Sequence, residues 1–114
     1  RTWMEADPTQ CLGNPWERDW LQSHNNDYSS YPRNPHTPEL EAEEIRIIKD
    51  YYDKNYQITI YDVRSTTFEK KFGKPIAVCQ ACGCPEGYTL YLLIMNSDVE
   101  RMLNLGYQLS SGPQ

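Results

Sequence analysis

Three of the four cysteines of this 114-residue chain lie in the stretch CQACGCPEG, which carries the most specific chemistry in the sequence. Cys79, Cys82 and Cys84 form the pattern CxxCxC, and the fourth cysteine, Cys11, stands far away near the amino terminus. Thiolates at such spacing can bind a metal, a CxxC pair can exchange disulfides, and oxidised pairs can brace a fold. The sequence context of the cysteines indicates which of these three chemistries fits.

A structural zinc site would need soft ligands at the corners of a tetrahedron, and the four cysteines could supply them, with His24 or His36 as substitutes. Such sites usually draw paired ligands from two short knuckles, whereas Cys11 stands alone. The sequence therefore keeps a zinc-binding domain with four cysteine ligands only as an alternative, and we expect no metal and no other cofactor.

A redox site would use Cys79 and Cys82, with the attacking thiolate made acidic by the start of a helix. The residues after Cys82 are Gly83, Cys84 and Pro85, which cannot begin a helix at the second cysteine. This context disfavours a redox enzyme.

Two structural disulfides fit the even number of cysteines in so short a chain. A bridge between Cys82 and Cys84 would close a strained ring, so two pairings remain: Cys11–Cys82 with Cys79–Cys84, or Cys11–Cys84 with Cys79–Cys82. In both pairings one bridge closes a local loop, and the other ties the amino-terminal arm to the body of the domain. Closing a loop of roughly 70 residues contributes on the order of 4 kcal/mol to stability.

The composition excludes several classes of partner. There are 16 Asp and Glu residues against 11 Lys and Arg, a net charge of −5, so the chain has no basic footprint for nucleic acid. The longest apolar run, 90–95, is far shorter than a membrane span, and the amino terminus has no apolar signal core. Because the chain begins with Arg1 and has paired cysteines, we expect a processed, exported protein that is secreted, periplasmic or at the cell surface.

The elements that must position the cysteines begin with an aromatic and Pro-rich arm over 1–37. Asn14 and Pro15 predict the cap and first turn of a short helix that ends near Ser23. Trp16 and Trp20 lie on one face of this helix, with Leu21 beside them, and we expect them to pack on the domain. The polar stretch 24–37 predicts a loop.

Periodic patterns begin after the arm. Thr37-Pro38-Glu39 predicts the start of the main helix, which runs to about Asp53. We expect four strands and a last short helix capped by Asn96-Ser97-Asp98, in chain order Tyr56–Tyr61, Thr66–Phe72, Pro75–Cys79, Tyr88–Met95 and Val99–Leu105.

The predicted fold is α+β. It has a four-stranded, mainly antiparallel meander that can curl toward a small OB-like barrel, one main helix, two short helices and two disulfides. The whole chain, 1–114, forms one domain, with a helix-plus-sheet body over 38–109 and a frayed tail over 110–114.

No catalytic motif is present: there is no P-loop, GxSxG, HExxH or dinucleotide fingerprint. His24 and His36 both fall in the predicted loop, and the run of Glu39, Glu41, Glu43 and Glu44 is typical of the exposed start of a helix. We therefore expect a binding module rather than an enzyme.

Three stretches have compositions that suit protein recognition, because tyrosine gives contact area at low entropic cost and a closed loop is preorganised. They are the loop around Tyr28, the cysteine loop 80–87 and the arm ahead of Cys11. The candidate contact residues are Trp3, Met4, Tyr28, Tyr31, Arg33, Gln80, Ala81, Gly83, Pro85 and Glu86.

Two patches of the sequence resemble a known class of proteins. Cys11 followed by Asn14-Pro15-Trp16-Glu17, and the cysteine cluster closing in Pro85-Glu86-Gly87, resemble small cell-envelope lipoprotein domains of Bacteroidetes-type bacteria, with the potempin protease inhibitors among them. The resemblance implies inhibition of a secreted protease, and also a lipidated amino-terminal cysteine that trimming would have removed. We thus expect an exported protease inhibitor that acts through the cysteine loop or the arm, with a non-inhibitory envelope interaction subunit as the alternative.

Overall fold

A computed structural model describes residues 1–33 and 39–113 and has an α+β fold, which confirms the predicted class. The sheet has four antiparallel strands in the order β2-β3-β1-β4. Their bounds are β1 Thr2–Ala6, β2 Asp62–Thr67, β3 Tyr88–Ile94 and β4 Gln108–Ser110. The sheet stays open, so it does not curl into a barrel, and its order is not that of a meander.

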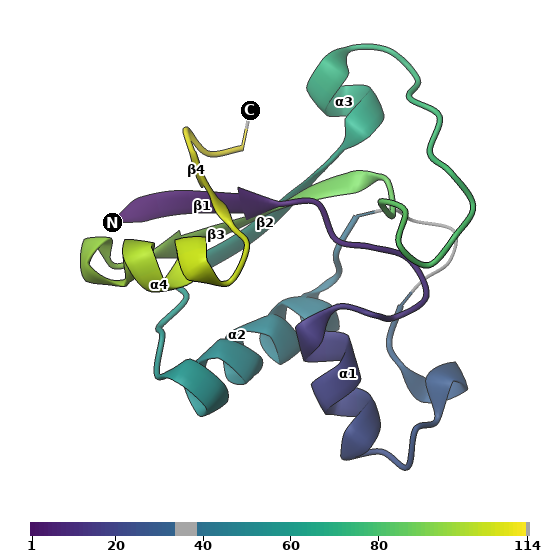
Figure 1. Cartoon of the computed structure of the whole chain (residues 1–114), viewed down its shortest axis with the longest axis horizontal. Helices are drawn as coiled ribbons and strands as arrows, with labels where there is room; N and C mark the ends of the chain where they lie inside the picture. The colour runs from purple at the N-terminus through teal and green to yellow at the C-terminus, as the bar shows by residue number, and fades with distance from the viewer. Residues whose placement is uncertain (34–38, 114) are drawn as a thin grey trace.

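Four α-helices accompany the sheet, one long and three short. Their bounds are α1 Pro15–Gln22, α2 Ala42–Tyr56, α3 Phe68–Phe72 and α4 Val99–Asn104, with single 3₁₀ turns η1 Tyr28–Ser30 and η2 Asn96–Asp98. Helices α1, α2 and α4 lie on one side of the sheet, whereas α3 lies beyond the end of β2 and away from them (Figure 1). Among the described residues, no helix is long and apolar enough to cross a bilayer.

The core forms between the sheet and the helices on that side. Strand β3 is the central, most buried strand, as predicted, because it pairs with both β1 and β2. Leu90, Leu92 and Ile94 alternate along it and are fully buried against α2 and its neighbours. The intervening Thr89 and Tyr91 are buried as well, on the opposite face of the sheet.

The first residues of the chain are not a free arm, and this part of the prediction was wrong. They form β1, between β3 and β4, so Met4 is fully buried in the core. Trp3 points to the other face, where its ring meets Tyr91 edge to face at 6.5 Å. The carboxyl-terminal stretch is also tied down, since Ser110 pairs with Trp3 and Gly112 packs on the same indole.

Helix α1 begins at Pro15 after Asn14, as the sequence predicts, and the backbone amide of Asn14 donates to Glu17 Oε1 at 3.0 Å. Trp16 and Leu21 are buried on its inner face. Helix α2 begins only at Ala42; the predicted start at Thr37 and Pro38 falls outside the described residues.

Three predicted strands were wrong. Tyr56 ends helix α2, and Gln57 turns the chain in the left-handed conformation, after which Ile58 and Ile60 are buried as the alternation indicated but form no strand. Strand β2 lies earlier than predicted, and 68–72 is helix because the Thr67 side chain caps it by accepting from the amide of Lys70. The stretch 75–79 has no regular structure.

Candidate functional site

The four cysteines form two disulfides, Cys11–Cys82 and Cys79–Cys84. Their Cα atoms are 5.1 and 5.5 Å apart, within the range that a disulfide spans. This confirms the first of the two predicted pairings. No cysteine remains as a thiol, so the sulfurs that a four-cysteine zinc site or a Cys79–Cys82 redox pair would need are engaged otherwise. Disulfides of this kind are typical of proteins that fold in an oxidising environment outside the cytoplasm.

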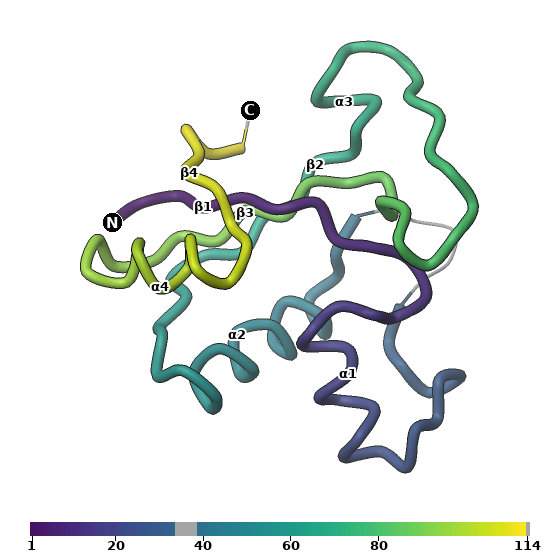
Figure 2. The backbone as a smooth tube through the Cα atoms, in the orientation of Figure 1, coloured from purple at the N-terminus to yellow at the C-terminus, as the bar shows by residue number. Residues whose placement is uncertain are grey.

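The disulfides hold an exposed loop, which we call the braced loop and define as residues 73–84. The chain leaves α3 at Gly73, runs as a long arc around the outside of the molecule and returns to the start of β3 (Figure 2). From Phe72 to Gly83 every residue is exposed except Val78, which is half-buried. Between Lys74 and Val78 the backbone forms no hydrogen bond with other described residues. The loop therefore presents unpaired peptide groups to solvent.

The base of the braced loop is fixed to the segment between β1 and α1. The amide of Gln10 donates to the carbonyl of Cys84 at 3.0 Å, and the amide of Glu86 donates to the carbonyl of Pro8 at 2.8 Å. The side chain of Gln10 donates to the carbonyls of Cys79, at 2.7 Å, and Pro85, at 3.0 Å. These bonds and the two disulfides clamp one end of the loop, while α3 holds the other end.

A shallow hollow of about 340 Å³ adjoins this clamp. It lies between the segment before α1 and the braced loop, and its lining residues are Gln10, Cys11, Val78, Gln80 and Glu86. A side chain of a partner that contacts the loop can enter this space.

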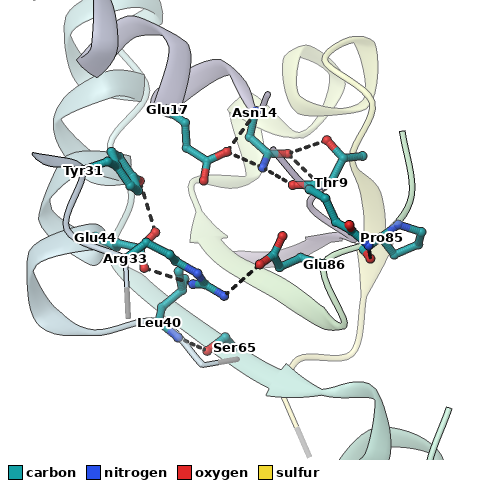
Figure 3. Close-up of polar contacts among 11 residues, drawn as sticks. Thr9, Asn14, Glu17, Tyr31, Arg33, Leu40, Glu44, Ser65, Pro85 and Glu86 are labelled. Carbon is teal, nitrogen blue, oxygen red and sulfur yellow. Dashed lines mark hydrogen bonds and ion pairs between the residues drawn. The ribbon is translucent and has the colours of Figure 1, made fainter. Parts of the chain in front are cut away.

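Behind the clamp lies a buried polar cluster (Figure 3). Arg33 donates to Glu44 Oε1 at 3.0 Å, and its guanidinium lies 3.9 Å from Glu86 Oε1 and 4.9 Å from the centre of the Tyr88 ring. The hydroxyl of Tyr31 donates to Glu44 Oε2 at 3.1 Å. The cluster thus joins four parts of the chain: the loop before residue 34, helix α2, strand β3 and Glu86.

A second carboxylate, Glu17, belongs to the same cluster. Asn14 donates to Glu17 Oε1 from its side chain at 2.6 Å, and also reaches the carbonyl of Thr9 at 2.9 Å. Burial is the main reason that the pKa of Glu17 is raised to about 7; the hydrogen bonds from Asn14 and the charge of Arg33 oppose this rise, and the charge of Glu44 adds to it. Burial also raises the pKa of Glu44 above its ordinary value, although Arg33 and Tyr31 favour its charged form. Both carboxylates are almost wholly buried, so this cluster holds the scaffold rather than meeting a partner.

The structure brings together only some of the predicted contact residues. Gln80, Ala81 and Gly83 are exposed on the braced loop, while Pro85 is half-buried and pairs with Thr9. Glu86 is exposed and lies beside Arg33.

The other predicted contact residues lie elsewhere. Tyr28 is exposed, but on the 3₁₀ turn after α1. Met4 and Tyr31 are buried, so neither can contact a partner, and the prediction that they are surface residues was wrong. Trp3 is half-buried on the far face of the sheet, Arg33 is half-buried beside Glu44, and His36 lies outside the described residues.

The exposed residues that sequence reasoning missed are Phe72, Lys74, Pro75 and Ile76. The stretch Pro75–Cys79 was predicted as a strand because proline suits a strand start, but Gly73 and Pro75 are also signals of a loop.

No protein-family model, curated protein or solved structure matches this chain.

Proposed function

We propose that this protein is an exported protein-binding module that inhibits a secreted protease by placing the braced loop in the cleft of the enzyme. The observation that carries the proposal is the stretch 74–78, which is exposed except for the half-buried Val78. Its backbone forms no hydrogen bond with other described residues, and its two ends are fixed. Proteases are one class of partner that binds an extended segment through its peptide groups, as an added strand.

The chemistry of the loop supports this use. From Pro75 to Gly83 no side chain is charged, and Ile76, Ala77 and Val78 offer small and branched apolar groups to the subsites of an enzyme. Binding a loop that is already fixed loses less conformational entropy than binding a free peptide does. Such a loop can therefore bind more tightly than a substrate of the same sequence.

The clamp also explains how such a loop would resist digestion. If the enzyme cut a peptide bond between Lys74 and Val78, the carboxyl-terminal piece would remain attached to the amino-terminal piece through Cys11–Cys82, and Cys79–Cys84 would keep the new end of that piece closed. The amino-terminal piece would remain attached to α3, whose Phe68 is buried. Both pieces would stay at the active site, so the cut protein would dissociate slowly.

An inhibition assay tests the proposal directly. The protein is added in excess to metallo-, serine and cysteine proteases of secreted type, and the initial rate on a short fluorogenic peptide is measured. For an enzyme that is slowed, Ile76→Asp should raise the inhibition constant at least about tenfold, because a central contact is replaced by a charge. Leu103→Asp, on α4, is the matched control, since Leu103 is 42% exposed and Ile76 is 36% exposed.

Inhibition of none of the enzymes, or equal inhibition by the Ile76→Asp variant, would contradict the proposal. The alternative, a non-inhibitory interaction subunit of the cell envelope, would then be favoured, with the braced loop as its contact surface.

A further inference from the structure

A second concave surface lies between α1 and α2. These two helices lie away from the braced loop (Figure 1). It has a volume of about 330 Å³, at the lower end of the range for ligand-binding pockets. We call it the helix cleft; the residues that define it here are Asp19, Trp20, Ile47, Asp50, Tyr51 and Asp53.

The helix cleft is negatively charged. Three aspartates line it, Asp19, Asp50 and Asp53, against the single ammonium of Lys54. Lys54 is already bound, with Nζ at 2.7 Å from Asp19 Oδ2 across the two helices. Asp50 and Asp53 are exposed, and neither forms an ion pair with a residue of the described chain. Two carboxylates are therefore available to a cation from outside.

The walls of the cleft include two aromatic rings. Trp20 and Tyr51 are both half-buried, so part of each side chain is accessible from the cleft. The indole of Trp20 is held in place by His24, which stacks on it with the ring centres 3.7 Å apart, and by the edge of Tyr31. A cation beside a fixed aromatic ring is stabilised by the ring quadrupole.

We propose that the helix cleft binds an arginine side chain from an exposed segment of a partner protein. Charge complementarity selects a cation, and a flat guanidinium can stack on an aromatic ring while it donates paired hydrogen bonds to carboxylates. The proposal does not depend on the inhibition of a protease, since the cleft and the braced loop share no residue.

A titration of the ¹⁵N-labelled protein with Nα-acetyl-arginine amide, followed by NMR, tests this assignment. Nα-acetyl-citrulline amide, which has nearly the same shape and no charge, is the control ligand. We expect saturable shifts with a millimolar dissociation constant at Trp20 and at 50–54, and no such shifts with citrulline.

Variants make the test specific. Asp50→Asn with Asp53→Asn should weaken binding roughly tenfold, because two charge-assisted contacts are lost. Glu100→Gln, which removes an exposed carboxylate on α4, should leave binding unchanged. Since both aspartates are exposed, the double variant should fold normally, which its NMR spectrum will show.

Three results would overturn the proposal: shifts that spread over acidic residues outside the cleft, unchanged binding by the double variant, or equal binding of Nα-acetyl-lysine amide. The last result would show that the cleft does not select a guanidinium. If the titration showed no binding at the helix cleft, the proposal that the braced loop inhibits a protease would still stand, because the inhibition assay tests a different surface.

Discussion

Arg33 and Glu44 form an ion pair inside the protein, with a nitrogen to oxygen distance of 3.0 Å and side chains only 13% and 1% exposed. Glu44 lies in the first turn of α2, and Arg33 belongs to the polar loop after α1. The same guanidinium lies near Glu86, whose amide hydrogen bond to Pro8 is part of the clamp. One buried pair therefore links α2 to the base of the braced loop.

Removal of Arg33 should destabilise the protein strongly. In Arg33→Met the Glu44 carboxylate would remain buried without its cation, which costs about 3 kcal/mol or more. The exposed pair of Arg46 and Glu43 gives a matched control, since Arg46→Met should cost less than about 0.5 kcal/mol. Urea unfolding curves of the two variants measure the difference. Similar midpoints for both would mean that the buried pair contributes no more than a surface pair.

Glu17 should make stability depend on pH. Its pKa in the folded protein is about 7, above the ordinary value of 4.5, because the side chain is buried. The folded state therefore binds more protons than the unfolded state between about pH 4.5 and pH 7. The contribution of Glu17 to the free energy of unfolding is fully present below pH 4.5 and is lost as the pH rises to about 7.

Glu17→Gln tests this dependence. Glutamine keeps an oxygen that can accept from Asn14, so the free energy of unfolding of the variant should depend less steeply on pH in this range, with the part due to Glu44 remaining. At pH 8 it should be more stable than the parent by on the order of 3 kcal/mol. Urea unfolding at several pH values measures this, with the exposed Glu100→Gln as control. A profile for Glu17→Gln as steep as that of the parent would assign the dependence to other groups.

The parts of the fold that could be predicted from sequence are those with a local cause. Pro15 after Asn14 starts α1, and the apolar run of β3 marks the central strand, because each signal lies within a few residues of its effect. Helix α3 could have been found in the same way, from Thr67 as its cap and Gly73 as its left-handed end.

The parts that could not be predicted depend on distant partners. Met4 is buried only because β1 inserts between β3 and β4, a pairing that no local pattern encodes. Glu44 has the pattern of an exposed helix-start residue, and it is buried only because Tyr31 and Arg33 fold back over it. The exposed position of the braced loop could not be predicted either. Ile76 and Val78 alternate as in a strand, yet no strand of the described chain pairs with them.

Gly112 should be less replaceable than Gly106. Both have positive φ, of 95° and 98°, so alanine strains either backbone by roughly 1 kcal/mol. At Gly112 a new Cβ would also lie 2.8 Å from Cδ1 of the Trp3 ring, whereas at Gly106 it would meet nothing within 4 Å. We expect Gly112→Ala to cost about 2 to 3 kcal/mol in urea unfolding and to shift the indole signal of Trp3 in NMR spectra. Equal costs at both sites would show that the carboxyl-terminal stretch does not hold its contact with Trp3.

The two disulfides should contribute unequally to stability. The Cys11–Cys82 bridge spans 71 residues and Cys79–Cys84 spans 5, and the entropy removed from the unfolded chain grows with the length of the closed loop. Replacing both cysteines of the long bridge by alanine should cost about 4 kcal/mol, and replacing those of the short bridge about 2 kcal/mol.

Intact mass first establishes that both bridges are present, since the non-reduced protein should be lighter than the reduced one by about four hydrogens. Urea unfolding of each double-alanine variant then gives the two costs. The short bridge fixes the carboxyl-terminal end of the stretch 74–78 that we place in the protease cleft, so its loss should weaken inhibition more than its modest cost in stability would suggest. The variant without the long bridge should lose more stability but less inhibition. At temperatures where it is still folded, Gln10 and Pro8 keep their hydrogen bonds to the base of the braced loop, so inhibition should persist. If the short-bridge variant inhibits as well as the parent, preorganisation of the braced loop is not what makes it bind.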